Sequence, residues 1–195
     1  MGFLPERAPE RRTTDDSELI DRAKQGDVDA YAELVRRYQR DARRTAAAIG
    51  GAGLADDAAQ EAFVRAYAFL HRFRPGAPFR PWLLAIVANV ARNQRRSVGR
   101  WSRATRATCE RGVAPGHAPS AEDVVLTDHG SGALRAAVDG LPHRYRDVVA
   151  CRYLLELSED ETARVLGIAR GTVKSRLSRA LDRLERQIER EMPRA

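Results

Sequence analysis

The sequence predicts an all-α protein built from two small helical domains joined by a flexible basic linker. Apolar residues recur at steps of three and four through most of the 195 residues, a spacing typical of amphipathic helices. No alternating apolar and polar run indicates a β-strand. The helical pattern stops over residues 97–132, where Ser, Gly, Thr, Ala, Pro and Arg predominate, and it resumes at Leu134.

This interruption sets the expected domain organisation. We expect a flexible N-terminal tail over residues 1–15, a first domain over residues 16–98, a linker over residues 99–119 and a second domain over residues 120–192. A weak helical stretch at residues 121–126 is assigned to the second domain.

Glycines and prolines separate four expected helices in the first domain. Asp15 and Glu18 form a capping pair for the first helix, and Asp27 can cap the second. The glycines at residues 50–53 end the second helix. A stiff proline-rich loop then separates the last two helices, which are expected over residues 56–73 and 81–96.

The second domain is expected to hold a short helix at residues 134–139 and longer helices over residues 142–155, 158–166 and 170–191. Ser158 and Glu161 have the spacing of a capping box, in which each side chain bonds the other residue's amide. A short helix, a turn that contains glycine and a long basic helix together indicate a helix-turn-helix.

In such a unit the second helix enters the major groove of DNA with its first residues at the base edges. The alternative is an ordinary helical hairpin with a solvated basic face. The residues that would face DNA are Arg170, Thr172, Lys174, Ser175, Ser178 and Arg179.

Positive charge is concentrated in two segments. The chain has 34 Lys+Arg and 27 Asp+Glu, a formal net charge of +7. Residues 92–112 hold seven arginines and one glutamate, and residues 170–190 hold seven basic and three acidic residues. The rest of the chain is slightly acidic. This distribution indicates a polyanionic partner, either nucleic acid or an anionic membrane surface.

Several classes of protein are excluded. No apolar run approaches the ~18–20 residues of a membrane span, and the charged, proline-broken N-terminus is not a signal peptide. Cys109 and Cys151 are too few for a disulfide framework or a tetrahedral zinc site. The four histidines have no ligand spacing, and no phosphate-binding glycine loop or nucleophile motif is present. We therefore expect a cytoplasmic protein with no catalytic site, no metal and no cofactor.

Aromatic and basic residues alternate around the proline-rich loop. Phe73, Phe79 and Trp82 are interleaved with arginines, and Asn89 and Arg92 follow on the next helix. Aromatic rings can stack on unpaired bases, arginines neutralise phosphates, and asparagine can bond a base edge. This combination indicates a surface for single-stranded nucleic acid. The alternative is core packing, which is favoured for Trp82 and left open for Phe73.

In order and spacing, these motifs resemble those of bacterial RNA polymerase sigma factors of the extracytoplasmic function (ECF) group. The resemblance covers all but the first fifteen residues and the linker. In the first domain it rests on Gly26-Asp27-x-x-Ala30-Tyr31-x-x-Leu34-Val35-x-x-Tyr38, Asp57-x-x-Gln60-Glu61-x-Phe63-x-x-x-Tyr67, Phe73-Arg74, Phe79-x-x-Trp82-Leu83 and Asn89. In the second domain it rests on Leu141-Pro142 and Gly167-x-x-x-Gly171-Thr172-Val173-Lys174-Ser175-Arg176.

The resemblance implies a role for each domain. The first, sigma region 2, docks on the clamp helices of core RNA polymerase and captures the melted non-template strand of the −10 promoter element. The second, sigma region 4, reads the −35 duplex and contacts the polymerase flap. An anti-sigma factor is an implied further partner. By position, the docking residues are Asp57, Gln60 and Glu61, the −10 strand residues are Arg65, Phe69, Phe73, Arg74, Phe79, Asn89 and Arg92, and the −35 residues are Arg170, Thr172, Lys174, Ser175, Arg176, Ser178 and Arg179.

Two alternatives remain at this point. A stand-alone dimeric helix-turn-helix regulator would explain residues 134–190, but it leaves the aromatic loop and the acidic turn at Asp57 without a role. Redox control through Cys109 is a further alternative, because neighbouring arginines can lower a thiol pKa; Cys151 is expected in the core.

The chain also departs from the family pattern. Ala58 and Ala59 stand where bulky apolar residues are frequent. Ala169 stands where serine or proline is frequent, and an alanine there cannot cap the recognition helix with its side chain.

Overall fold

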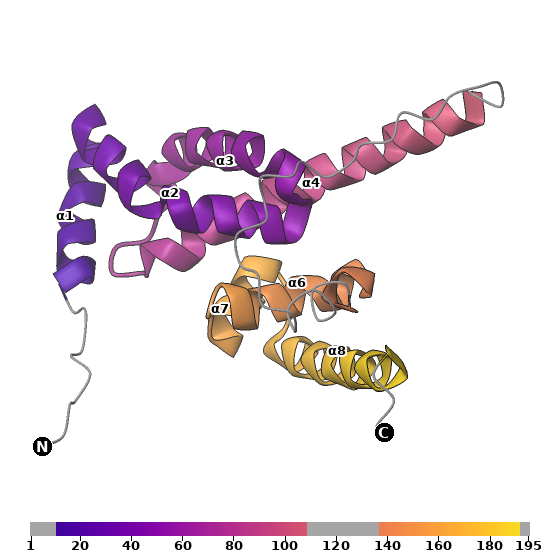
Figure 1. The fold of residues 1–195 in the computed structure, drawn as a ribbon. Helices are drawn as coiled ribbons and strands as arrows, with labels where there is room; N and C mark the ends of the chain where they lie inside the picture. Colours follow the sequence, from indigo (N-terminus) through magenta and orange to yellow (C-terminus); the bar gives the residue numbers. More distant parts are fainter. Residues whose placement is uncertain (1–10, 109–136, 192–195) are drawn as a thin grey trace, which may run out of the picture.

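The computed structural model describes residues 11–108 and 137–191, and every regular element in these residues is helical. The expected all-α class is therefore confirmed. The first domain contains α1 (Arg11–Lys24), α2 (Val28–Gly50), η1 (Ala52–Leu54), α3 (Ala55–Phe69), η2 (Leu70–Arg72) and α4 (Phe79–Thr108). The second contains α6 (His143–Val149), a π-helical turn η4 (Ala150–Leu154), α7 (Glu159–Leu166) and α8 (Arg170–Glu191) (Figure 1).

Two of the predicted helix caps are confirmed. The Asp27 carboxylate accepts a 3.0 Å hydrogen bond from the amide of Ala30 at the start of α2. Ser158 and Glu161 form both bonds of the capping box at the start of α7. The predicted cap at Asp15 is wrong, because α1 already begins at Arg11 and no glycine or proline interrupts it before Lys24.

Helix α4 is longer than expected. It was predicted to end near Arg96, yet it continues to Thr108 and enters the segment assigned to the linker. Only Gly99 weakens the helix in this stretch, and no proline is present to end it. The extension projects away from the body of the molecule (Figure 1). The remaining linker residues, Cys109 and the expected helical stretch at 121–126 lie outside the described residues.

Small residues bring α2, α3 and α4 close together. The added Cβ of an alanine at Gly50 would meet the Cβ of Ala91 at 3.2 Å, a distance that shows how near α2 approaches α4. Close approach of backbones increases the number of dispersion contacts between helices. Alanines with no exposed surface line these contacts: Ala42 and Ala46 on α2, Ala58 and Ala62 on α3, and Ala88 and Ala91 on α4. Ala58 is thus a core residue, where a bulky side chain would separate the helices.

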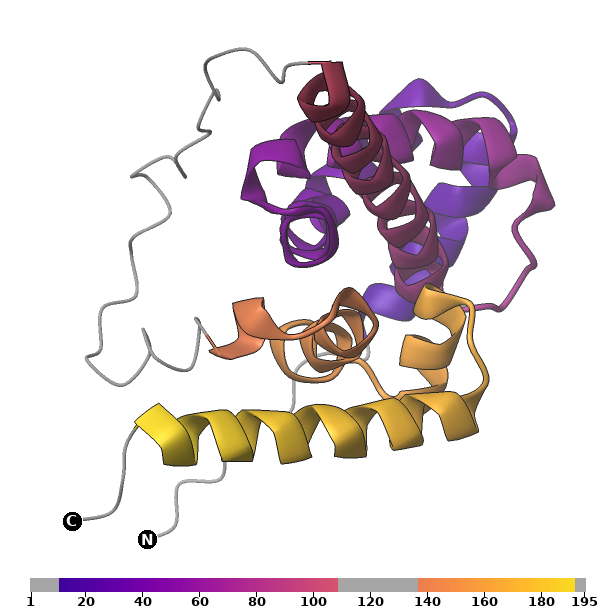
Figure 2. The same cartoon turned by 90° about the vertical axis from the view of Figure 1, so that its right-hand side faces the viewer.

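The second domain packs against the first. Buried residues of the second domain, including Cys151, Leu157 and Leu166, belong to the same apolar cluster as Leu34 and Leu83 of the first. Figures 1 and 2 show α6 and α7 lying against the side of the first domain formed by α2 and α4, with α8 on the outside. A flexible linker between independent domains does not predict this shared core. None of the helices described is long and apolar enough to cross a membrane.

Candidate polymerase and nucleic-acid interfaces

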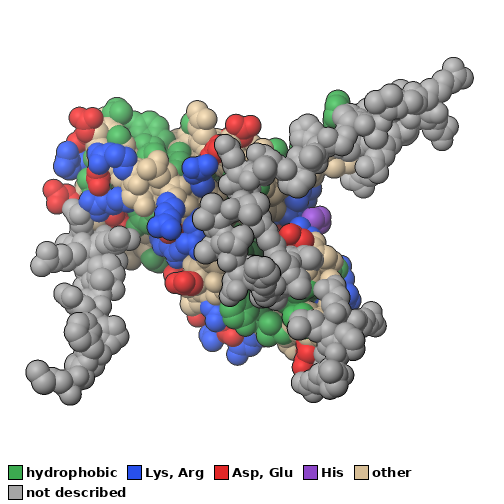
Figure 3. All heavy atoms as spheres, in the orientation of Figure 1, with side chains coloured by type: hydrophobic (Ala, Val, Ile, Leu, Met, Phe, Trp, Pro, Cys, Tyr) green, Lys and Arg blue, Asp and Glu red, His purple; other side chains and the backbone are tan. Residues whose placement is uncertain are grey.

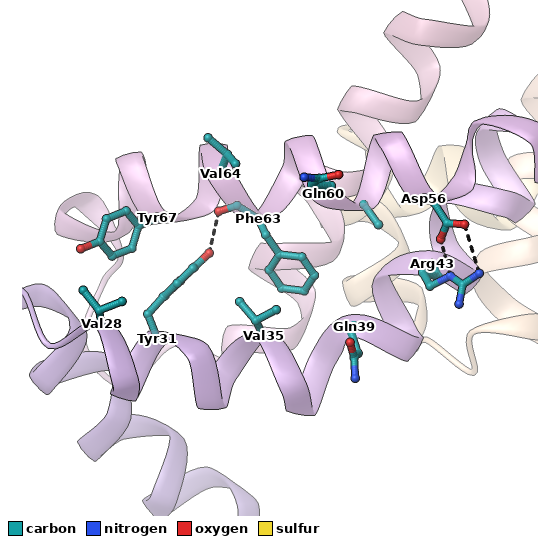
Figure 4. A pocket seen from close by; sticks show the side chains of 11 residues that line it. Val28, Tyr31, Val35, Gln39, Arg43, Asp56, Gln60, Phe63, Val64 and Tyr67 are labelled. Carbon is teal, nitrogen blue, oxygen red and sulfur yellow. Dashed lines mark hydrogen bonds and ion pairs between the residues drawn. The ribbon is translucent and has the colours of Figure 1, made fainter.

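An apolar groove runs between α2 and α3, and its volume is about 600 Å³. Its rim carries Val28 and Val64, each 67% exposed, and Tyr67, 42% exposed. Hydrophobic side chains are visible among charged ones on this side of the molecule (Figure 3). Large apolar side chains left in water at such a site mark an interaction surface. The groove is lined by Val28, Tyr31, Val35, Gln39, Arg43, Asp56, Ala59, Gln60, Phe63, Val64 and Tyr67 (Figure 4).

Specific contacts hold the two walls of this groove together. The Tyr31 hydroxyl donates a 2.6 Å hydrogen bond to the carbonyl of Phe63, and the rings of Tyr31 and Tyr67 lie 4.7 Å apart. Burial raises the pKa of Tyr31, so its hydroxyl stays a donor. At the other end, Arg43 and Asp56 form an ion pair across the groove (Figure 4). These contacts join α2 and α3 at both ends of the groove.

The three predicted docking residues do not share one face. Asp57 and Gln60 are exposed at the start of α3, and Gln60 also lines the groove. Glu61 faces α4 instead, where its carboxylate accepts a 2.7 Å hydrogen bond from the Gln94 amide and pairs with Arg65. The apolar groove was not among the sequence predictions, although two residues that line it, Tyr31 and Val35, belong to the motif that resembles the family.

Phe73 and Phe79 are buried, although both were assigned to the strand-binding surface. Each is only 4% exposed. Their ring centroids lie 5.7 Å apart, and the ring of Trp82 lies 5.0 Å from Phe73 and 5.5 Å from Phe79. Tyr38 packs against Phe79 at 5.3 Å. The open choice for Phe73 is thus settled in favour of core packing, since the proline-rich loop folds its aromatic residues inward.

The other candidates for strand binding lie on the surface. Phe69 is 46% exposed, and the guanidinium of Arg72 lies 5.5 Å from the centre of its ring. Arg65, Arg74 and Asn89 are also exposed. An exposed aromatic ring next to arginines suits a stacked base with neighbouring phosphates.

Arg92 is half-buried, and its guanidinium is already hydrogen-bonded within the protein. Its guanidinium donates to the carbonyls of Leu166 at 3.0 Å and Val165 at 3.2 Å, both in the second domain. Burial lowers the pKa of Arg92. In this structure Arg92 therefore does not present its donors to a strand.

The two helices α7 and α8 form the predicted helix-turn-helix. Gly167 ends α7 in the left-handed conformation, with φ of 66°, which favours glycine. Val173, Ala180 and Leu184 form the buried stripe of α8. Of the seven predicted −35 residues, Thr172 and Arg176 are half-buried at the edges of this stripe, and the exposed ones are Arg170, Lys174, Ser175, Ser178 and Arg179.

Acidic residues of α7 form ion pairs with the first basic residues of α8. Arg170 pairs with Glu159 at 2.9 Å and with Asp160 at 3.5 Å, and Lys174 lies 3.8 Å from Glu159. The hydrogen bond from Arg170 lowers the pKa of Glu159, so this carboxylate stays charged. These two acids were not among the residues predicted to act at the DNA interface. Glu159 lies 11 residues before Arg170, so no local pattern in the sequence signals this pairing.

Comparisons with known proteins match both domains to one family. The Sigma-70 region 2 family matches residues 34–101, and the Sigma-70 region 4 family matches residues 131–184. The ECF RNA polymerase sigma factor SigW of Bacillus subtilis (strain 168) is 33% identical over 178 residues, which span 87% of this chain and 94% of SigW. The chain belongs to the ECF RNA polymerase sigma factors.

Solved structures are similar to this chain in fold. The structure of CnrH in complex with the cytosolic domain of CnrY has a TM-score of 0.65 and 25% identity, covering 91% of this chain and 99% of CnrH. The sigma factor RpoE, solved in complex with the anti-sigma factor NepR from Bartonella quintana, is similar in fold, with a TM-score of 0.64 and 24% identity over 84% of this chain and 98% of RpoE.

As an ECF sigma factor, the chain directs core RNA polymerase to promoters and initiates transcription. A stand-alone helix-turn-helix regulator is not favoured, because region 2 is matched as well as region 4. An anionic membrane surface was the alternative partner for the two basic segments. Promoter DNA accounts for these segments without it. Among residues 11–108 and 137–191, no cluster of His, Cys, Asp and Glu could hold a metal ion.

Replacing Ala169 with serine should stabilise this sigma factor. The Ala169 carbonyl accepts the first bonds of α8, from the amides of Thr172 at 2.9 Å and Val173 at 3.1 Å, so Ala169 occupies the N-cap. A serine hydroxyl can accept from a further free amide of the first turn, which is worth about 1 kcal/mol. We expect Ala169→Ser to raise the free energy of unfolding in urea by that amount. Ala169→Val, which has no acceptor, is the matched control, and equal stability of the two variants would contradict the prediction.

The Cys151 thiol should be unreactive in the folded protein. Cys151 is fully buried, and burial raises the pKa of its thiol to about 12. Below the ordinary thiol pKa of about 8.5 the buried neutral thiol retains its full contribution to stability, which is lost as the pH rises toward about 12. In a Cys109→Ser variant at pH 8, we expect an aromatic disulfide reagent to label the native chain at least a hundredfold more slowly than the urea-unfolded chain. Equal rates would show that Cys151 is accessible.

Proposed function

We propose that this ECF sigma factor docks on the clamp helices of core RNA polymerase through the groove between α2 and α3. The observation that carries this proposal is the exposed apolar rim formed by Val28, Val64 and Tyr67, beside the polar residues Asp57 and Gln60. An apolar groove flanked by polar groups suits an amphipathic helix. In this proposal Glu61 does not contact the polymerase; it supports the groove by bonding Gln94 of α4, which fixes α3 to α4.

We further propose that Phe69, Arg65, Arg74 and Asn89 capture the melted non-template strand of the −10 element. Stacking on Phe69 and phosphate contacts to the arginines suit single-stranded DNA, and Asn89 can bond the edge of a flipped base. Phe73 and Phe79 support this surface from the core. Arg92 joins it only when its contacts with the second domain are released.

The −35 duplex is then read by the exposed polar face of α8. Lys174, Ser175, Ser178 and Arg179 lie on the side opposite the buried stripe, as major-groove reading requires. Thr172 and Arg176 flank this face and suit contacts with phosphates. In this proposal the factor carries no catalytic residue and acts in the cytoplasm with the polymerase.

An anti-sigma factor is proposed as the regulator of this chain. The proposal is supported by the likeness in fold to RpoE, which was solved with the anti-sigma factor NepR. Co-purification with a membrane or cytoplasmic protein that blocks holoenzyme formation would support it.

Reconstituted transcription tests the proposed sites together. Core polymerase loaded with this chain is expected to yield genome-wide transcripts whose start sites share one −35 and one −10 motif. Ser178→Ala should relax the −35 motif, and Asn89→Ala should relax the −10 motif. A start-site motif unchanged by both substitutions would overturn the assignment of the two readers.

A further inference from the structure

Two acidic residues of α7 lie at the edge of the face of α8 that is proposed to read the −35 duplex. Glu159 and Asp160 are the first two residues of α7, and their carboxylates pair with Arg170, the first residue of α8. DNA phosphates repel a carboxylate, so acids at the start of a recognition helix weaken binding to any duplex. Their position therefore calls for a role that offsets this loss.

The start of α8 is electrically neutral because of these acids. The positive end of the α8 dipole lies at its first turn, where a cation such as Arg170 is disfavoured. Arg170 and Lys174 pair there with the two carboxylates, so two positive charges meet two negative ones. Phosphate binding then falls to basic residues farther along α8, of which Arg179 is exposed.

The contact between Arg170 and Glu159 is directional, whereas the contact of Lys174 is not. The Nε of Arg170 donates a 2.9 Å hydrogen bond to Oε2 of Glu159, and Asp160 lies 3.5 Å from Nη1 of the same guanidinium. The Nζ of Lys174 lies 3.8 Å from Oε2 of Glu159, beyond hydrogen-bond distance. The guanidinium of Arg170 is thus restrained at two points, although its side chain is 56% exposed.

A guanidinium held through Nε presents its two Nη groups as a pair of donors. Guanine offers two acceptors, N7 and O6, at one edge in the major groove, and an arginine bound to both is the commonest specific contact. The first residues of a recognition helix are the ones that face base edges. A side chain that is already held in place also loses less freedom on binding. Arg170 therefore suits the reading of one guanine better than a mobile contact with phosphate.

We propose that Glu159 is a positioning residue for −35 recognition, which holds Arg170 so that its Nη groups read one guanine of the duplex. The inference rests on the proposed role of α8 as the −35 reader. In it Glu159 does not contact DNA and acts only through Arg170. The alternative is that the acids merely compensate charge at the start of α8. Exposed ion pairs contribute little to stability, so variants of Glu159 should stay folded.

A double-mutant cycle in the reconstituted holoenzyme tests the proposal. The probe is a pool of duplexes from one mapped promoter with its −35 element randomised, and the bound fraction is sequenced. Arg170→Ala should lower the preference for guanine at one −35 position by about fivefold or more. Glu159→Ala should lower it at the same position. In the Arg170→Ala background, Glu159→Ala should cause no further loss, because the two residues act as one unit.

Two further variants separate positioning from charge. Glu159→Gln keeps an acceptor for Nε of Arg170, so it should retain most of the preference for guanine. Glu185→Gln is the matched control, since it removes the same charge from an exposed residue near the end of α8. It should leave the base preference unchanged.

Several outcomes would overturn the proposal: a base preference unchanged by Arg170→Ala or by Glu159→Ala, a further loss in the double variant, or an equal loss in Glu185→Gln. Ser178→Ala distinguishes these outcomes from a failure of the proposed function. If Ser178→Ala relaxes the −35 motif and Glu159→Ala does not, α8 reads the duplex without help from Glu159. If neither does, the −35 reader itself is wrongly assigned.

Discussion

Replacing Val64 with glutamate is expected to lower the affinity of the chain for core RNA polymerase about a hundredfold. Val64 is 67% exposed on the rim of the α2–α3 groove. A carboxylate placed there loses its hydration when a partner helix covers the groove. An unpaired charge in an interface costs about 2–5 kcal/mol, and 1.4 kcal/mol is a factor of ten in affinity.

The measurement is a fluorescence titration of labelled chain with core polymerase. Because Val64 is exposed, the free energy of unfolding should change by no more than about 0.5 kcal/mol. Ala52→Glu introduces the same charge at an exposed residue of η1 outside the groove, and it should bind polymerase like the wild type. Unimpaired binding by Val64→Glu would place polymerase on another surface of the molecule.

Replacing Phe73 with alanine is expected to lower the free energy of unfolding by about 3–5 kcal/mol, the usual cost of truncating a buried phenylalanine. Phe73 is 4% exposed and contacts the rings of both Phe79 and Trp82. Such a loss is a large share of the roughly 5–15 kcal/mol that stabilises a typical domain. Urea unfolding measures it directly.

The exposed ring of Phe69 should behave in the opposite way. Phe69→Ala is expected to leave unfolding within about 0.5 kcal/mol of the wild type, while weakening holoenzyme binding to a −10 single strand by about 1–3 kcal/mol, as loss of one stacked base does. The pair of variants separates a ring that supports the surface from a ring that forms it. Strand binding lost in Phe73→Ala at unchanged stability, but kept in Phe69→Ala, would reverse the assignment.

Two neighbouring alanines of α3 have different roles in the core and in the docking groove. Ala58 is buried among α2, α3 and α4, whereas Ala59 lines the groove. A small side chain at Ala59 leaves room in the groove that a bulky residue would fill. The departure from the family pattern at these two alanines therefore affects packing at one position and the shape of the docking surface at the other.

The order of the helices and most of their boundaries could be read from the sequence. Asp27, Ser158 and Gly167 act on backbone groups within a few residues of themselves, so their effect does not depend on the rest of the chain. The buried stripe of α8 follows from helical periodicity in the same way. Local signals thus determined the all-α class, the helix-turn-helix and the exposed side of its second helix.

Only the tertiary structure decided which candidate side chains remain available. Phe73 and Phe79 resemble stacking residues in sequence, but Phe79 is buried against Tyr38 of α2 and Phe73 against Trp82 of α4. The pairing of Arg92 with Leu166 joins residues 74 positions apart. Hydrophobic burial and the satisfaction of unpaired carbonyls depend on which surfaces meet in space, and no pattern within one helix specifies that. The sequence by itself therefore determined the parts of this sigma factor, while packing between distant segments decided the apolar groove, the inward aromatic cluster and the closure of one domain on the other.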